Sequence, residues 1–246
     1  MSKLAEAFVG KKALMAFVTC GDPSLEVTGQ VIRSAVEAGA NIIELNIPFS
    51  DPTAVDPVIQ QANIRALEKG VTTDKIFDCI RALRQDVTVP IIISGYANVV
   101  YSYGTERFLK NCADIGIDGL IIPDVPFEEQ EEFLPMCQKY GVDLISMIAI
   151  TSKERIHAIA KAATGFLYIM ENPGGTTEEL EWIIRQVRKV SDIPCAVCIS
   201  DVDAPRFHET KDLVDGVVQD ALIVRMMASS PENIGSHVVK MKNALR

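Results

Sequence analysis

A glutamate interrupts an otherwise apolar segment, Ile-Ile-Glu-Leu-Asn-Ile, at residues 42–47. Such a segment is typical of a buried strand, in which side chains alternate between two faces. If the face that carries Glu44 lines a cavity, the carboxylate is partly removed from water and its pKa rises. It could then serve as a general acid or base. The alternative is a carboxylate that only forms hydrogen bonds to neighbouring loops.

Further carboxylates follow other apolar segments of the chain. Asp56 lies in the loop after the segment of Glu44, and Glu171 and Asp220 directly follow two later segments. Hard divalent cations take oxygen ligands, so Glu171, Asp201 and Asp220 could together bind one. No tight ligand motif supports this, and we expect no metal site.

Two cysteines, Cys195 and Cys198, lie three residues apart in Pro-Cys-Ala-Val-Cys-Ile-Ser. This segment is typical of a strand, in which residues three apart point to opposite faces. The pair therefore cannot chelate one metal ion or form a thioredoxin-type dithiol.

Eight short β-rich segments must position these residues, and they alternate with helical patterns along the chain. Most are continuous Val, Ile and Leu runs, which are typical of parallel strands covered on both faces. A helix end, a small residue and a buried strand recur in EAGANIIEL, DIGIDGLII and KYGVDLISM. Without a GxGxxG turn after the first strand, this repeat favours an α/β fold of the TIM (β/α)₈ barrel type over a Rossmann sheet. The expected strands are Leu14–Thr19, Asn41–Ile47, Pro90–Ser94, Gly119–Pro123, Asp143–Ile148, Gly165–Met170, Pro194–Ile199 and Gly216–Val218.

No linker or low-complexity segment interrupts this alternation, so we expect residues 1–246 to form one barrel domain. One expected helix spans Pro126–Tyr140 and ends at Gly141, another opens at Ser152, and Trp182 is expected to pack. Catalytic groups of such barrels come from the C-terminal ends of the strands, where Glu44 lies.

Composition restricts the class of partner and the compartment. The net charge of −9 argues against nucleic acids and anionic membranes, which attract basic patches. The longest apolar runs, such as Gly119–Pro123, are far shorter than the ~20 residues that span a bilayer. The start of the chain lacks the pattern of a signal peptide, and the six spread cysteines indicate reduced thiols. We therefore expect a cytoplasmic protein that binds a small molecule.

Four motifs carry a resemblance to a known family. The chain resembles the tryptophan synthase alpha subunit family from about Leu14 to Thr151, and again in Asp-Gly-Val-Val and the final helix. The motifs are VTCGDP at 18–23, IELNIPFSDPTA at 43–54, GYANVVYSYG at 95–104 and IPDVPFEE at 122–129.

The resemblance implies a TIM barrel that cleaves indole-3-glycerol phosphate to indole and glyceraldehyde 3-phosphate by a retro-aldol step. It implies no cofactor, and a complex with a beta subunit that carries pyridoxal phosphate, docked through the Pro48–Asp56 loop. Glu44 matches the catalytic glutamate of the family. Phe17 and Tyr168 match residues that line the indole pocket, and Thr176 matches a threonine in the sixth loop.

The chain departs from the family pattern at the ends of several strands. The second catalytic carboxylate of the family aligns with Val55, and Asp56 comes one residue later, which turns its side chain by roughly 180° in an extended loop. The loop after the sixth strand is short and begins at Glu171. Ser94 and Gly95 are smaller than their family counterparts and predict a wider pocket, which we expect Tyr96 to line as well.

The phosphate site departs further. The family binds phosphate with glycine-rich turns, because bare backbone approaches an anion closely and a helix N-terminus adds a positive field. Here the turns read Cys198-Ile199-Ser200-Asp201 and Gln219-Asp220-Ala221, so glycines are lost and carboxylates arrive. An aspartate beside a phosphate dianion at a half-buried site is strongly unfavourable.

Three hypotheses follow from these observations. The chain is a lyase of the family type with weakened activity, or an enzyme with a remodelled pocket. In the second case Glu44 or Glu171 abstracts a proton from a non-phosphorylated, aromatic substrate. In the third, the chain is a non-catalytic barrel that docks a beta-type subunit.

Overall fold

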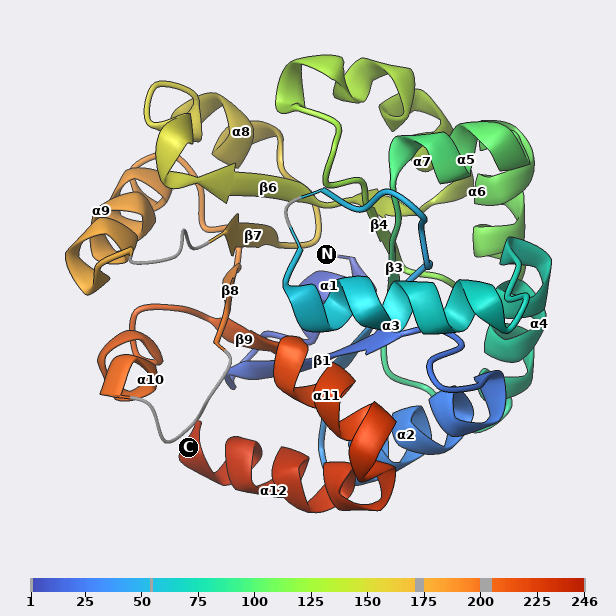
Figure 1. The fold of residues 1–246 in the computed structure, drawn as a ribbon. Coiled ribbons are helices and arrows are strands. Elements are labelled where there is room, and N and C mark those ends of the chain that lie inside the picture. Colours follow the sequence, from blue (N-terminus) through green and yellow to red (C-terminus); the bar gives the residue numbers. More distant parts are fainter. Residues whose placement is uncertain (1, 54, 171–174, 200–204, 246) are drawn as a thin grey trace.

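The strands of this computed structural model form one parallel sheet that closes into a barrel, with helices around it (Figure 1). The structure describes residues 2–53, 55–170, 175–199 and 205–245. The strands are β1 (Ala13–Thr19), β2 (Ile42–Asn46), β3 (Ile91–Ser94), β4 (Gly119–Ile121), β5 (Asp143–Leu144), β6 (Ser146–Ala149), β7 (Leu167–Met170), β8 (Cys195–Cys198) and β9 (Gly216–Gln219).

One barrel strand is divided in two. The sheet order is β5-β4-β3-β2-β1-β9-β8-β7-β6, so β5 and β6 lie at its two ends. Only Ile145 separates them in the chain, with β5 paired to β4 and β6 paired to β7. The two halves of this strand therefore join the ends of the sheet. The predicted TIM (β/α)₈ barrel is confirmed, with its fifth strand broken at one residue.

Two apolar cores lie on the two faces of the sheet. Along β1, Leu14, Ala16 and Val18 belong to the core between the sheet and the helices. Met15 and Phe17 belong to the core inside the barrel. This alternation is the period-two pattern of a strand, and here both faces are buried.

The same alternation separates the two cysteines of β8. Cys195 lies in the outer core, whereas Cys198 packs against the inner core. The prediction that they face opposite sides is confirmed.

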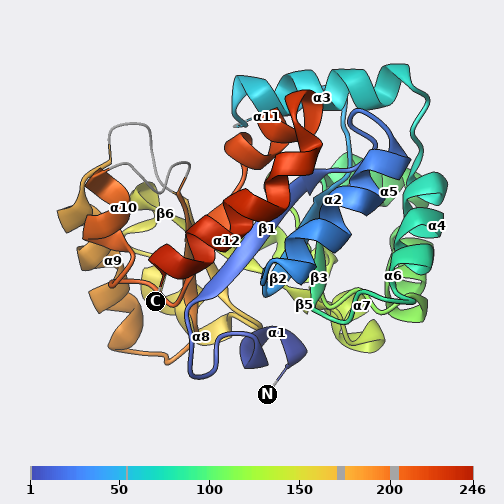
Figure 2. The same cartoon turned by 90° about the horizontal axis from the view of Figure 1, so that it is seen from below.

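Helices close both ends of the barrel interior (Figure 2). Leu4 and Phe8, in and just after α1 (Lys3–Glu6), belong to the inner core at the N-terminal end of the strands. Ile59 and Ala62 of α3 (Pro57–Glu68) belong to the same core at the other end, as does Val224 of α11 (Ala221–Ser229). The other helices are α2 (Leu25–Glu37), α4 (Thr73–Leu83), α5 (Ala97–Tyr103), α6 (Thr105–Asp114), α7 (Leu134–Tyr140), α8 (Ile156–Ala162), α9 (Thr177–Arg188), α10 (Pro205–Thr210) and α12 (Ile234–Ala244).

Helix boundaries differ from the prediction in two places. The expected helix Pro126–Tyr140 is a 3₁₀ segment, Phe127–Glu132, followed by α7, because Pro135 cannot donate to the preceding turn. Gly141 ends α7 in the left-handed conformation, as predicted. The helix expected to open at Ser152 begins at Ile156 instead.

Trp182 does not pack in the core as predicted. Its side chain is 37% exposed on α9, and the Lys153 ammonium lies 5.9 Å from its ring centroid. In the described part of the chain, no helix is long and apolar enough to cross a bilayer.

Candidate active site at the barrel mouth

The mouth is the C-terminal end of the barrel interior, where β1, β2 and β3 present two rows of side chains. Strand register aligns Phe17 with Glu44, and Glu44 with Ile92. The next inward-facing row, two residues further along, is Thr19, Asn46 and Ser94, aligned in the same way. We call these two rows the β1–β3 wall. Pairing in a parallel sheet thus places Glu44 one row below the rim.

Burial dominates the chemistry of Glu44. The side chain is 3% exposed, and removal from water raises the pKa of its carboxyl to about 8. The neighbouring Ser94 hydroxyl partly offsets this rise in pKa, and negative charge on Asp220 adds to it. The raised pKa agrees with the expectation from the sequence. At neutral pH the carboxyl is mostly protonated and can donate a proton.

Three buried oxygens of the β1–β3 wall form no hydrogen bond of ordinary geometry. They are Thr19 Oγ1, Glu44 Oε2 and Ser94 Oγ, each without a partner in the described part of the chain. Such groups carry a free-energy penalty in an apolar interior until a donor or acceptor reaches them. The wall is therefore ready to form hydrogen bonds with a ligand.

Aromatic rings flank the carboxyl. Phe17 lies beside Glu44 on β1, and Tyr168 of β7 belongs to the same inner core. Desolvation, followed by the charges of Glu44 and Asp220, raises the pKa of the Tyr168 phenol well above its usual range. Aromatic and apolar side chains thus surround the Glu44 carboxyl.

The β9–α11 junction lies on another side of the mouth. Asp220 is the N-cap of α11, and its carboxylate accepts the Ala221 N–H. The buried Gln219 amide donates to the Ile199 carbonyl, and its oxygen lies 2.8 Å from His237 Nε2. These groups satisfy one another and fix the junction. The Ile199 side chain lies in the outer core.

The loop before α3 presents a valine to the interior. Val55 packs against the inner core, whereas Asp56 is exposed and accepts the Val58 N–H at 2.8 Å as the N-cap of α3. The structure therefore does not bring Asp56 to Glu44. Pro57 at the first helical position favours this arrangement. An N-cap followed by proline was the signal in the sequence.

Three other predicted site residues have structural partners away from the β1–β3 wall. Thr176 is exposed and caps α9 in a reciprocal box with Glu179. A side chain on Gly95 would meet Ile47 of the outer core, so the widening expected there lies outside the mouth. Tyr96 donates to the Thr53 carbonyl at 3.2 Å.

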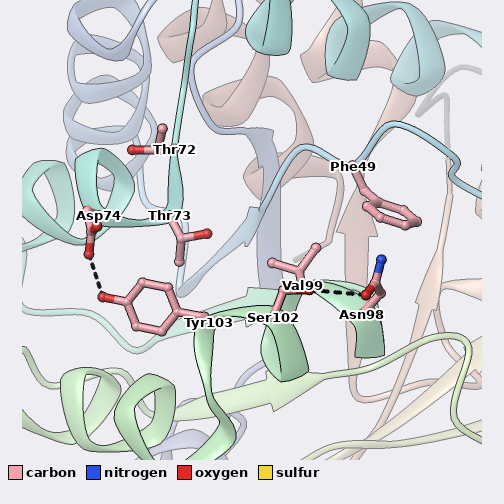
Figure 3. Close-up of a pocket in the computed structure, with 8 residues that line it drawn as sticks. All are labelled: Phe49, Thr72, Thr73, Asp74, Asn98, Val99, Ser102 and Tyr103. Carbon is pink, nitrogen blue, oxygen red and sulfur yellow. Dashed lines mark hydrogen bonds between the residues drawn. The ribbon is translucent and has the colours of Figure 1, made fainter.

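Tyr96 also stacks on Phe49, with ring centroids 5.0 Å apart, and so supports the Pro48–Asp56 loop from below. Beside Phe49, an open pocket of about 360 Å³ lies on the outer rim (Figure 3). Its lining includes Asn98, Ser102 and Tyr103 from α5. This pocket is separate from the barrel interior.

Sequence reasoning missed the clamp that holds α3 over the mouth. Arg65 donates two hydrogen bonds to the fully buried carboxylate of Asp22, at 2.8 and 2.7 Å. Asn46 donates to Asn63 at 2.8 Å, both buried. The partners are far apart in the chain, and only the fold brings them together.

Some predicted residues cannot be placed. Glu171, Ser200 and Asp201 lie outside the described residues. Glu171 and Asp201 are two of the three carboxylates considered above as metal ligands. Among the described residues, no group of three or more His, Cys, Asp or Glu side chains could hold a metal ion.

Comparisons with known proteins agree with the motifs. The model of the tryptophan synthase alpha chain family matches residues 4–246. The tryptophan synthase alpha chain of Lacticaseibacillus casei is 36% identical over 100% of this chain and 95% of its own length. That of Alkaliphilus metalliredigens is 39% identical over 94% of this chain and 91% of its own length.

Solved structures show the same barrel. A chain from Aquifex aeolicus VF5 superposes with a TM-score of 0.93 at 29% identity, over all of both chains. The alpha subunit of Legionella pneumophila gives 0.90 at 28%, over 100% of this chain and 98% of that one. The chain belongs to the tryptophan synthase alpha chain family.

Proposed function

We propose that the chain is a carbon–carbon lyase that releases indole from a substrate of the indole-3-glycerol type, with Glu44 as the proton-transfer group. The observation that carries the proposal is the Glu44 carboxyl, which is buried beside aromatic side chains with its pKa raised to about 8 and has one oxygen without a partner among the described residues. A desolvated acid with a pKa near the working pH suits proton transfer to a weakly basic ring carbon.

The proposed reaction is a retro-aldol cleavage. The Glu44 carboxyl protonates the indole ring at C3. The protonated ring can accept an electron pair, so the bond from C3 to the carbinol carbon becomes easier to cleave. That bond breaks and its electron pair returns to the ring. The carbinol hydroxyl loses its proton to the Glu44 carboxylate and becomes an aldehyde. Indole and the aldehyde leave, and Glu44 is again protonated.

Glu44 performs both proton transfers in this scheme, because Asp56 does not lie beside it. Val55 packs against the interior, and Asp56 caps α3 in solvent. In this scheme Glu44 therefore acts first as acid and then as base. We propose that turnover is slower than in family members that use two carboxylates.

Indole release tests this proposal directly. The protein is incubated with indole-3-glycerol phosphate and, separately, with phosphate-free indole-3-glycerol, and indole is quantified by chromatography. Release from at least one compound is expected, with loss in the Glu44→Gln variant. Release from neither would overturn the lyase proposal and leave the remodelled enzyme and the non-catalytic role.

We propose that a beta-type subunit docks on the outer rim formed by the Pro48–Asp56 loop and α5. The Phe49 and Tyr96 rings hold the loop, and the pocket beside Phe49 offers a recess for a side chain (Figure 3). A recess lined by both polar and apolar groups suits a stable but reversible contact.

Size-exclusion chromatography with a tryptophan synthase beta chain from a related bacterium checks the docking proposal. Co-elution is expected, and Phe49→Ala should weaken it at least tenfold. Arg81→Ala, on the exposed side of α4, is the control. Separate elution at micromolar concentrations of both chains would contradict this docking.

A further inference from the structure

The β9–α11 junction differs from an anion site in one respect that bears on the substrate. A helix N-terminus normally offers free N–H groups and a partial positive charge to a phosphate. At α11 the Asp220 carboxylate already accepts the Ala221 N–H, so this chain supplies its own anion. A second anion at that place would meet like charge.

The described groups around Glu44 and Tyr168 do not compensate the charge of Asp220. Glu44 lies within electrostatic range of Asp220, and Tyr168 lies within range of both carboxyls. Among the described residues, the groups whose charges act on Glu44 or Tyr168 are all acidic. A phosphate dianion would therefore enter an uncompensated negative field in a partly desolvated site.

The β1–β3 wall offers what the junction lacks. Thr19 Oγ1, Ser94 Oγ and Glu44 Oε2 are buried on three neighbouring strands at the same end of the barrel, and no described residue forms a well-aligned hydrogen bond with them. Two hydroxyls and a protonated carboxyl can each donate and accept, which matches the hydroxyl groups of a neutral polyol.

We propose that the mouth selects a neutral, hydroxylated indole derivative, and that Asp220 excludes the phosphate monoester of the same compound. That the ring is an indole rests on the proposed function. The preference for hydroxyl groups over a phosphate rests on the two sides of the mouth. The β1–β3 wall binds the hydroxyl groups, and Asp220 fills the place that a phosphate would need.

The test uses a matched pair of ligands that cannot be cleaved, indole-3-propanol and its phosphate monoester. Neither carries a hydroxyl on the carbon next to the ring, so binding is measured without turnover. Isothermal titration calorimetry of the whole chain at neutral pH is expected to show the alcohol binding at least tenfold more tightly than the ester.

Asp220→Asn removes the charge and keeps an oxygen that can cap α11. It should raise the affinity for the ester at least tenfold and leave the affinity for the alcohol within about twofold. Asp220→Ser, a second cap without charge, guards against a folding defect in the first variant. Asp212→Asn makes the same charge change at an exposed site beside Lys12 and should leave the ratio of affinities unaltered.

Tighter binding of the ester to the unaltered protein would overturn the proposal. An unchanged ratio in both Asp220 variants, or binding of neither compound, would also overturn it. These outcomes are separable from failure of the lyase proposal, which is indole release from neither glycerol compound. A chain that shows the expected binding ratio and no release selects its ligand as proposed but is not a lyase.

Discussion

Two sides of the same barrel mouth treat their polar groups in opposite ways. On the β1–β3 wall, Thr19 Oγ1, Ser94 Oγ and Glu44 Oε2 are buried without a well-formed hydrogen bond to any described residue. At the β9–α11 junction, Gln219 and Asp220 have partners within the protein. The polar groups of the wall remain able to form hydrogen bonds with a ligand, at a cost in stability. Those of the junction form their hydrogen bonds within the protein and make it rigid. The comparison indicates where a ligand binds and which ligand is refused.

The largest expected effect is on catalysis and comes from a substitution in the β1–β3 wall. Glu44→Gln keeps the shape of the side chain and removes the transferable proton. Because general acid–base groups contribute about 10²–10⁴-fold, kcat for indole release should fall by about a thousandfold. Steady-state kinetics on whichever glycerol compound is cleaved checks this. Activity within threefold of the unaltered protein would show that Glu44 is structural.

The same residue should make stability depend on pH. Its pKa in the folded protein is raised from 4.5 to about 8, so folding favours the protonated form. Its contribution is fully present below about pH 4.5 and is lost as the pH rises to about 8, a change of about 3 to 6 kcal/mol.

Urea unfolding of the unaltered protein and of Glu44→Gln across this range isolates the effect. The difference between the two free energies of unfolding should move in favour of the variant as the pH rises. A difference that stays constant with pH would contradict burial of an ionisable Glu44.

The next largest effect on stability is expected from the clamp between Asp22 and Arg65, which holds α3 over the mouth. Arg65→Ala leaves the fully buried Asp22 carboxylate without its ion pair, and should lower the free energy of unfolding by about 2 to 3 kcal/mol. Arg81→Ala breaks the exposed pair with Asp78 and should cost at most about 0.5 kcal/mol. Equal losses in chemical denaturation would show that the clamp adds nothing special.

A crossed pair of substitutions gives the smallest and sharpest test. Gln219→Leu removes the donor to Ile199 and should cost about 1–3 kcal/mol. Ser94→Ala removes an oxygen that forms no well-aligned hydrogen bond with a described residue, so it should change stability by less than about 0.5 kcal/mol. Ser94→Ala should nonetheless weaken binding of indole-3-propanol severalfold. Stability losses in the reverse order would break the contrast between the two sides.

What the sequence could predict follows from periodicity. Alternation along β2 was enough to turn Glu44 inward, and repeated αβ units were enough to favour the barrel. The break at Ile145 could not be predicted. The run Asp143–Ile148 has the same pattern whether or not its two halves pair with different strands.

Loop side chains were harder, because no period sets their direction. The pairing of Asp22 with Arg65 joins residues 43 apart, and nothing local in the sequence announces it. Asp56 could have been foreseen as a helix cap from the proline that follows it.

The most direct test of the account is a carbon-13 NMR titration of the Glu44 carboxyl, with Glu44→Gln used for assignment. The account predicts a pKa of about 8 in the free protein and a further shift when indole-3-propanol is added. A pKa near the ordinary value of 4.5 that the alcohol leaves unchanged would contradict it.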